Sequence, residues 1–326
     1  MERRMRGATL AAVMALASVA SQAGGQIVPA SPRPPRPPRP PRVWMGGETG
    51  VAKIDTVVPF AANGTIDLSL VAGSIKVTTW DRSQVRVIAT TSGDATLQFD
   101  ASSSHLSLDQ SGRRSSRNGG GSATYDVTVP SGVRASLSSV SGSVQASGVR
   151  GSVDVNVVSG RVEVRDLGSS LNVEGVSGDV TASGIASDAR VGIVSGRISL
   201  SQVGGSVNAE TVSGGISLNG IAGDRVHATT VSGNIDIAAS PARAGRYDFE
   251  THSGRTDIRL GSNANATVSV ETFSGSVSND FPGAVRRANS DPDENSTNYN
   301  YVIGSGSARV RVETFSGTVH ITRGNP

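Results

Sequence analysis

The chain of 326 residues contains no cysteine. Disulfide bonds, metal sites built from thiolates and a lipid anchor on an N-terminal cysteine are therefore excluded. Aromatic residues account for only 4% of the sequence, so small aliphatic side chains have to fill the core. Such a core is thin and encloses no ligand cavity, which favours a function carried out on the surface.

Positive charge is scarce outside the N-terminal part of the chain. The formal net charge is +3, yet residues 1–42 hold seven of the 30 basic residues and one of the 27 acidic residues. From Val43 onward, 23 basic residues stand against 26 acidic ones, a net charge of −3. This part of the chain lacks the positive field of a nucleic-acid-binding protein, so we expect no nucleic-acid partner.

Long apolar runs are missing beyond the first residues. Three arginines within the first six residues precede an apolar run from Ala8 to Ala20, and Ser21-Gln22-Ala23 offers a cleavage site. Residues 1–23 are thus predicted to be a secretory signal peptide, and the run is too short to remain as a transmembrane helix. We expect an exported protein in the periplasm, on the cell surface or outside the cell.

Residues 24–53 are predicted to be a linker rich in proline and arginine. Residues 31–42 repeat with a period of three, which is the period of a polyproline II helix. Four arginines would therefore lie along one edge of that helix: Arg33, Arg36, Arg39 and Arg42. Two interpretations remain open, a stiff spacer and a contact with an anionic polymer or lipid of the cell envelope.

The rest of the chain is dominated by a repeated Ser-Gly pair. The pair occurs at 141, 159, 177, 195 and 213, at intervals of 18, and again at 232, 253, 274 and 316. With Ser as position 1, positions 4, 6, 9, 13, 15 and 18 are apolar. Alternation with a period of two indicates two short strands in each repeat. The sequence predicts an all-β fold, a right-handed parallel β-solenoid of 18–21 residues per coil.

The residue before each Ser-Gly, at position 18, is counted among about six core side chains per coil. In the 18-residue repeats this residue is always valine: Val158, Val176, Val194 and Val212. The serines themselves offer a row of hydroxyls, which suggests either a ligand strip or a structural turn. Recurrence in every coil favours the turn, because catalysis needs one serine and glycine adopts positive φ without steric cost.

Residues 54–130 are β-rich but outside the 18-residue register, and we expect an N-terminal cap that covers the open strand edges. Strands are predicted at 54–60, 65–70, 74–80, 84–91, 96–100, 105–109 and 124–129. Between the last two lies a polar, glycine-rich loop with three arginines: Arg113, Arg114 and Arg117. This loop is interpreted as a mobile connection, or as a basic contact with a partner.

The segments Gly73–Asp81, Val85–Val87 and Tyr125–Pro130, together with the Val-Ser-Gly repeats, resemble a bacterial family called the putative adhesins. The resemblance covers about 54–322. It implies an exported, β-helix-like domain without shared catalytic residues. The regular 18-residue coils and the proline linker depart from the family's usual pattern.

The solenoid is predicted to span 131–326 and to change character after Thr230. Position 18 becomes His252, Phe273 and Phe315, and the two phenylalanines are predicted to fill a wider core. Residues 279–298 are predicted to leave the wall, and a strand returns at 299–303. A candidate binding surface is placed on this excursion and its return, at Asp291, Asp293, Tyr299 and Tyr301.

Candidate catalytic groups are few. Acidic residues scatter over different positions of the repeat, and only Asp236 and Asp257 share a position in successive coils. The four histidines lack the spacing of a metal site. We predict no catalytic residue, metal or cofactor. The expected function is a non-enzymatic adhesin-like or scaffold solenoid of the cell envelope that binds a polymer, glycan or protein. The alternatives are a partner in envelope-stress signalling and a carbohydrate-active enzyme.

Overall fold

The computed structural model describes residues 43–45, 53–93, 95–112, 121–281, 286–287 and 297–324. The signal peptide and the linker predicted from the sequence lie outside these residues. So do seven of the candidate contact residues: Arg33, Arg36, Arg39, Arg42, Arg113, Arg114 and Arg117. Asp291 and Asp293 also lie outside. In the part of the chain that is described, the regular elements are β-strands, and no helix could cross a membrane.

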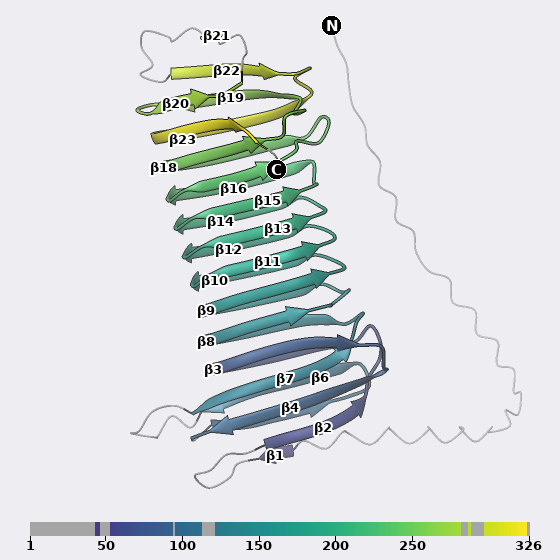
Figure 1. Ribbon diagram of the computed structural model, residues 1–326. Coiled ribbons are helices and arrows are strands. Elements are labelled where there is room, and N and C mark those ends of the chain that lie inside the picture. The colour runs from purple at the N-terminus through teal and green to yellow at the C-terminus, as the bar shows by residue number, and fades with distance from the viewer. Residues whose placement is uncertain are drawn as a thin grey trace, which may run out of the picture. The chain divides into compact units, whose positions relative to one another are not determined.

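Each repeat in the middle of the chain forms two strands. One sheet contains β10 (Leu171–Ser177), β12 (Ala189–Ser195), β14 (Val207–Ser213) and β16 (Arg225–Ser232). The other contains β11 (Val180–Ile185), β13 (Ile198–Val203), β15 (Ile216–Ile221) and β17 (Ile235–Ala239). Within each sheet the strands are parallel and offset by one repeat, so that Val180 pairs with Ile198. Figure 1 shows the resulting stack, and the fold is the predicted β-solenoid.

Several longer strands pass through the corner without interruption and contribute to both sheets, among them β8 (Arg134–Ser147), β9 (Val153–Leu167) and β18 (Arg246–Leu260). Strands β10, β12, β14 and β16 all end at this corner, on the left-hand edge of the stack in Figure 1. The corner coincides with the Ser-Gly pairs. The solenoid therefore has one tight, repeated edge and, opposite it, an edge of longer loops.

The core follows the predicted alternation except at one position. Positions 4, 6, 9, 13 and 15 point inward, and Val180 at position 4 is only 1% exposed. Position 18 was predicted to be buried, and this is wrong, because Val176 is 51% exposed. The inward alternation of 13 and 15 continues to position 17, where Ile193 and Thr211 are buried. The chain then turns, and positions 18 and 1 both face solvent.

Glycine at position 2 is required by the close approach of neighbouring coils. Gly178 has φ of 141°, a conformation that disfavours side chains. A Cβ atom at this position would lie 1.7 Å from the carbonyl oxygen of Gly160 in the preceding coil. The interpretation of Ser-Gly as structural is confirmed for the glycine.

The N-terminal strands confirm the predicted segments: β2 (Lys53–Pro59), β3 (Thr65–Trp80), β4 (Gln84–Ser92), β5 (Ala95–Ala101), β6 (His105–Gly112) and β7 (Ser122–Pro130). A short strand, β1 (Val43–Met45), pairs with β5. Antiparallel pairs β2–β4, β4–β7 and β5–β6 close this end. However, β3 is one continuous strand that pairs with β8 in coil register, with Gly73 opposite Gly142. The coil register therefore begins within the segment predicted as a cap.

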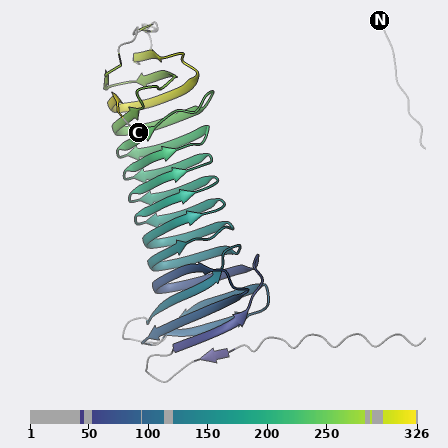
Figure 2. The ribbon, with the colours of Figure 1, turned by 45° about the vertical axis from the view of Figure 1, so that its right-hand side comes forward.

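The C-terminal strands are not stacked in the order of the sequence. They are β19 (Ala266–Thr272), β20 (Ser276–Asn279), β21 (Arg286–Arg287), β22 (Thr297–Ile303) and β23 (Ala308–Arg323). Strand β23 lies between β18 on one side and β19 and β20 on the other, parallel to all three. Strand β22 then pairs antiparallel with β19. Figure 2 shows this end from another direction.

Candidate functional site

A stripe of large apolar and aromatic side chains runs along the Ser-Gly corner. It contains the residue at position 18 of ten successive coils, and its valines are 46–51% exposed. In spatial order the members are Val71, Val140, Val158, Val176, Val194, Val212, Val231, His252, Phe315 and Phe273. We call these ten residues the corner stripe. No other position of the repeat presents apolar side chains with this exposure and uniformity.

At the C-terminal end of the stripe, three rings stack on one another. The ring centroids of His252 and Phe315 are 4.8 Å apart, and those of Phe315 and Phe273 are 4.7 Å apart. The interplanar angles are 8° and 6°, and the spacing matches the separation of neighbouring strands. The prediction that both phenylalanines fill a wider core is wrong, since each is 47% exposed. Position 18 faces solvent in every coil, whatever the side chain.

Three glutamates form a second ladder beside the rings. Glu250, Glu313 and Glu271 each precede a ring by two residues, and they lie opposite one another in the register of β18, β23 and β19. Arg311 forms an ion pair with Glu313 and approaches Glu271, at 3.9 Å between Nη2 and Oε2. One guanidinium thus serves two of three stacked carboxylates. The three glutamates and Arg311 together therefore leave a net negative charge beside the rings.

The rings and the glutamates border a groove of about 420 Å³. Val231, Thr230, Thr251 and Thr314 also line it. The hydroxyls of Thr251 and Thr314 are buried and have no hydrogen-bond partner in the part of the chain that is described. We call this hollow the C-terminal groove. Apolar ring edges beside carboxylates suit a ligand that joins an apolar group to a cation or hydrogen-bond donor.

Of the predicted tyrosine pair, only one side chain remains at the surface. Tyr301 and Ile303 alternate inward on β22, and Tyr301 is 4% exposed. Its assignment to a binding surface is therefore corrected to a core position, and burial raises the pKa of its hydroxyl. Tyr299 is half-buried, with its ring parallel to that of Tyr301 and the centroids 6.4 Å apart.

The fold brings together the one carboxylate pair that the sequence indicated. Asp236 and Asp257 are register partners on β17 and β18, and both are half-buried. Burial and then repulsion from Asp257 raise the pKa of Asp236 above its ordinary value. His320 lies opposite Asp257 in the next coil. Among the residues described, no set of three His, Asp or Glu side chains is grouped closely enough to hold a metal ion.

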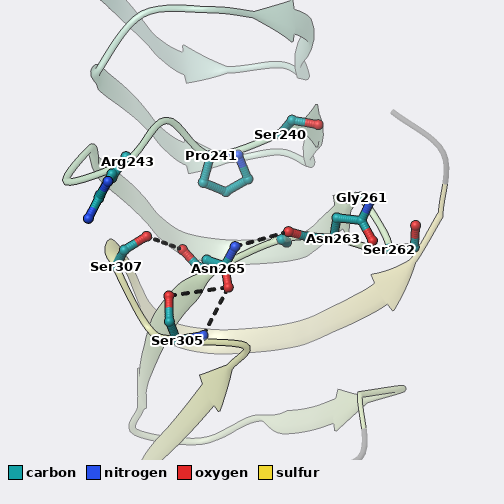
Figure 3. Close-up of a pocket in the computed structure, with 10 residues that line it drawn as sticks. Ser240, Pro241, Arg243, Gly261, Ser262, Asn263, Asn265, Ser305 and Ser307 are labelled. Carbon is teal, nitrogen blue, oxygen red and sulfur yellow. Dashed lines mark hydrogen bonds between the residues drawn. The ribbon is translucent and has the colours of Figure 1, made fainter.

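A hollow of about 540 Å³ lies among the loops of the opposite edge (Figure 3). The side chain of Asn265 organises it: Oδ1 accepts hydrogen bonds from the Ser305 backbone N–H at 2.9 Å and from Ser305 Oγ at 3.3 Å. Its Nδ2 donates to the carbonyl oxygen of Asn263 at 3.2 Å. These polar groups tie two loops together, which indicates a structural role.

The family model described as Toastrack DUF4097 matches residues 135–322, more than half of the chain. The chain belongs to this family. The match confirms the resemblance found on the Val-Ser-Gly repeats and agrees with a solenoid-like β fold. No curated protein matches the sequence.

Solved structures that resemble the Toastrack chain do so only weakly. A putative adhesin from Bacteroides fragilis shares 14% identity with a TM-score of 0.39, covering 83% of this chain and 97% of its own. A putative cell adhesion protein from Clostridium sporogenes shares 10% identity (TM-score 0.27), covering 84% and 100%. A putative adhesin from Parabacteroides merdae shares 10% (TM-score 0.28), covering 85% and 98%. These low scores carry no argument about function.

The C-terminal groove was not predicted from the sequence, although the sequence contains a pattern that marks it. In the repeats, Val at position 18 is replaced by His252, Phe273 and Phe315 only after residue 230. A glutamate precedes each of the three rings by two residues, at 250, 271 and 313. The joint pattern Glu-Thr-ring marks the site. Only the stacking order of the coils shows that Phe315 lies between the other two rings.

Proposed function

We propose that this Toastrack protein is an exported, non-enzymatic binding module of the bacterial cell envelope, of the adhesin or scaffold type. Its partner binds in the C-terminal groove. The observation that carries the proposal is the stack of three half-exposed rings beside three carboxylates. Exposed aromatic groups on a rigid scaffold give contact area at low cost in conformational entropy.

The chemistry of the groove defines the partner. Stacked rings cover one another's faces and present their edges, so they suit apolar contact more than the stacking of a sugar ring. The three glutamates and the neighbouring Asp248 outnumber Arg311, so the groove favours positive charge. The partner is therefore a polymer or polypeptide segment that carries a cationic group next to an apolar one.

Two features outside the groove support an envelope location. The signal-peptide pattern at 1–23 favours export, and Arg33, Arg36, Arg39 and Arg42 favour an electrostatic contact with anionic envelope material. The same arrangement serves an anchor or a partner in envelope signalling. In both roles the groove binds the partner, and the arginine-rich segment holds the protein on the anionic envelope.

A binding screen with matched variants tests the proposal. The purified protein is offered cationic, neutral and anionic peptides and the corresponding glycans, each with and without an apolar group. Binding is expected for cationic, apolar members, and the double variant Phe273→Ala, Phe315→Ala should lose at least tenfold in affinity. Glu250→Gln with Glu271→Gln should weaken binding and reduce its dependence on salt.

Val158→Ala is the matched control, since Val158 belongs to the corner stripe but lies far from the groove. It should bind as the unmodified protein does. Unchanged affinity in a folded Phe273→Ala, Phe315→Ala variant would place recognition elsewhere and overturn the proposal.

A further inference from the structure

Seven of the ten corner-stripe residues are valines; six of them lie outside the C-terminal groove and the seventh, Val231, lies at its border, and the proposed function gives the column of valines no role. They are Val71, Val140, Val158, Val176, Val194, Val212 and Val231. Each is about half exposed, although valine at an exposed site gains little from folding. Other outward positions of the same coils vary freely in charge. Position 14, for example, reads Asp154, Asn172, Arg190 and Asn208.

The valines border a second uniform column. The serines at position 1 are exposed and lie opposite one another in register: Ser141, Ser159, Ser177, Ser195, Ser213 and Ser232. Ala72 takes the corresponding place in β3. Neither column contains a charge in these seven coils. We call the seven valines and the residues beside them the valine edge.

We propose that the valine edge is a self-association surface on which a second copy of this chain packs edge to edge. The first argument is periodicity. Neighbouring coils are about 4.8 Å apart, so each copy presents a valine at that interval along the whole edge. A second copy has the same interval, and its valines stay in step over all seven coils. A partner with a different repeat drifts out of register along the edge.

The second argument is area and charge. Seven half-exposed valines and the small residues beside them present roughly 700 Å² per copy, close to the roughly 800 Å² per partner of a standard protein interface. Because both columns are uncharged, contact between them leaves no buried ion unpaired. A C2 dimer, in which the same patch of each copy forms the interface, follows from a surface of this kind.

Sedimentation equilibrium tests the proposal. The unmodified protein should form a concentration-dependent dimer, and Val176→Glu with Val194→Glu should shift it to monomer by at least tenfold in Kd. The matched control, Thr181→Glu with Asn219→Glu, adds the same charge at exposed positions of β11 and β15, away from the corner. It should dimerise as before. Circular dichroism melts confirm that all variants fold.

The natural absence of cysteine allows a direct test of the contact. Single substitutions of each edge valine by cysteine, oxidised mildly, should give linked dimers, whereas Thr181→Cys should not. Linkage at every position indicates parallel copies, and linkage at central positions alone indicates antiparallel ones. A monomer at high concentration, or a dimer unaffected by the two glutamates, overturns the proposal. The glutamates leave the groove intact, so ligand binding reports separately on the proposed function.

Discussion

Phe315 stacks on Phe273 with ring centroids 4.7 Å apart, although 42 residues of sequence separate the two. The opposite face of Phe315 covers His252. Phe315 thus occupies the centre of the stack because β23 lies between β18 and β19. The ring order in space, 252, 315 and 273, differs from the order in the chain.

Because of this order, the two phenylalanines are expected to contribute unequally to the free energy of unfolding. Phe315→Ala removes two ring contacts and Phe273→Ala removes one, and each contact contributes about 0.5–1.5 kcal/mol. The free energy of unfolding should therefore fall more for Phe315→Ala, by roughly 1–3 kcal/mol. Urea denaturation of both single variants and the double variant gives the coupling energy between the rings. A coupling near zero would show that the stack contributes nothing to stability.

Val180 and Thr181 test the register of the coils. Val180 is 1% exposed, and Thr181 next to it faces solvent. Val180→Asp buries an unpaired carboxylate and should lower the free energy of unfolding by several kcal/mol. Thr181→Asp should change it by less than about 0.5 kcal/mol. Thermal melts of both variants provide the comparison, and equal losses would contradict the inward direction of position 4.

Gly178 and Gly192 separate a required glycine from a replaceable one. Gly178→Ala forces a Cβ atom to within 1.7 Å of the Gly160 carbonyl oxygen at a φ of 141°. The two coils must move apart, and we expect a loss of several kcal/mol or failure to fold. A Cβ atom at Gly192 meets nothing within 4 Å. Gly192→Ala should be neutral or stabilise by about 0.4–1 kcal/mol, as chemical denaturation will show.

The pair Asp236 and Asp257 predicts a dependence of stability on pH. The pKa of Asp236 is raised in the folded state by burial and by Asp257. The folded state therefore holds this proton more tightly, and the associated stability is present at low pH and lost as the pH rises through the raised pKa. Asp236→Asn should raise Tm at pH 7 and leave it unchanged at pH 3.

The effect of Asp236→Asn is expected to be small, because the side chain is only half-buried and solvent screens its charge. The matched control is Asp154→Asn, at an exposed position of β9. Melting curves of the three proteins over pH 3–8 provide the measurement. An equal rise in Tm at both ends of the pH range would show that ionisation of Asp236 is not the cause.

Most of the solenoid could be predicted from the sequence, because the same pattern of alternating apolar residues recurs in every repeat. Alternating valines set the strands and their inward faces, and Ser-Gly set the corner. Position 18 was misassigned because an apolar column on a tight corner looks the same in sequence whether it is buried or exposed. The first coil escaped notice because Val71-Ala72-Gly73 stands in place of Val-Ser-Gly.

The groove could not be predicted for a different reason. Segments 266–277 and 308–319 are near copies, so either one fits beside β18, and local pattern does not decide between them. The choice depends on long-range pairing, in which β22 covers the outer edge of β19. Tyr301 was misassigned through the same pairing, since its place in the core exists only once β22 has docked.

The position of β23 also sets the sequence of assembly. As the chain is synthesised from its N-terminus, each coil up to β18 can pack on the coil that precedes it. Strands β19 and β20 precede β23 in the chain, but they pair with β23 and so cannot join the sheet until β23 has been added. The groove is therefore completed only when β23 has docked, and a chain that ends before residue 308 would lack Glu313 and Phe315 from it.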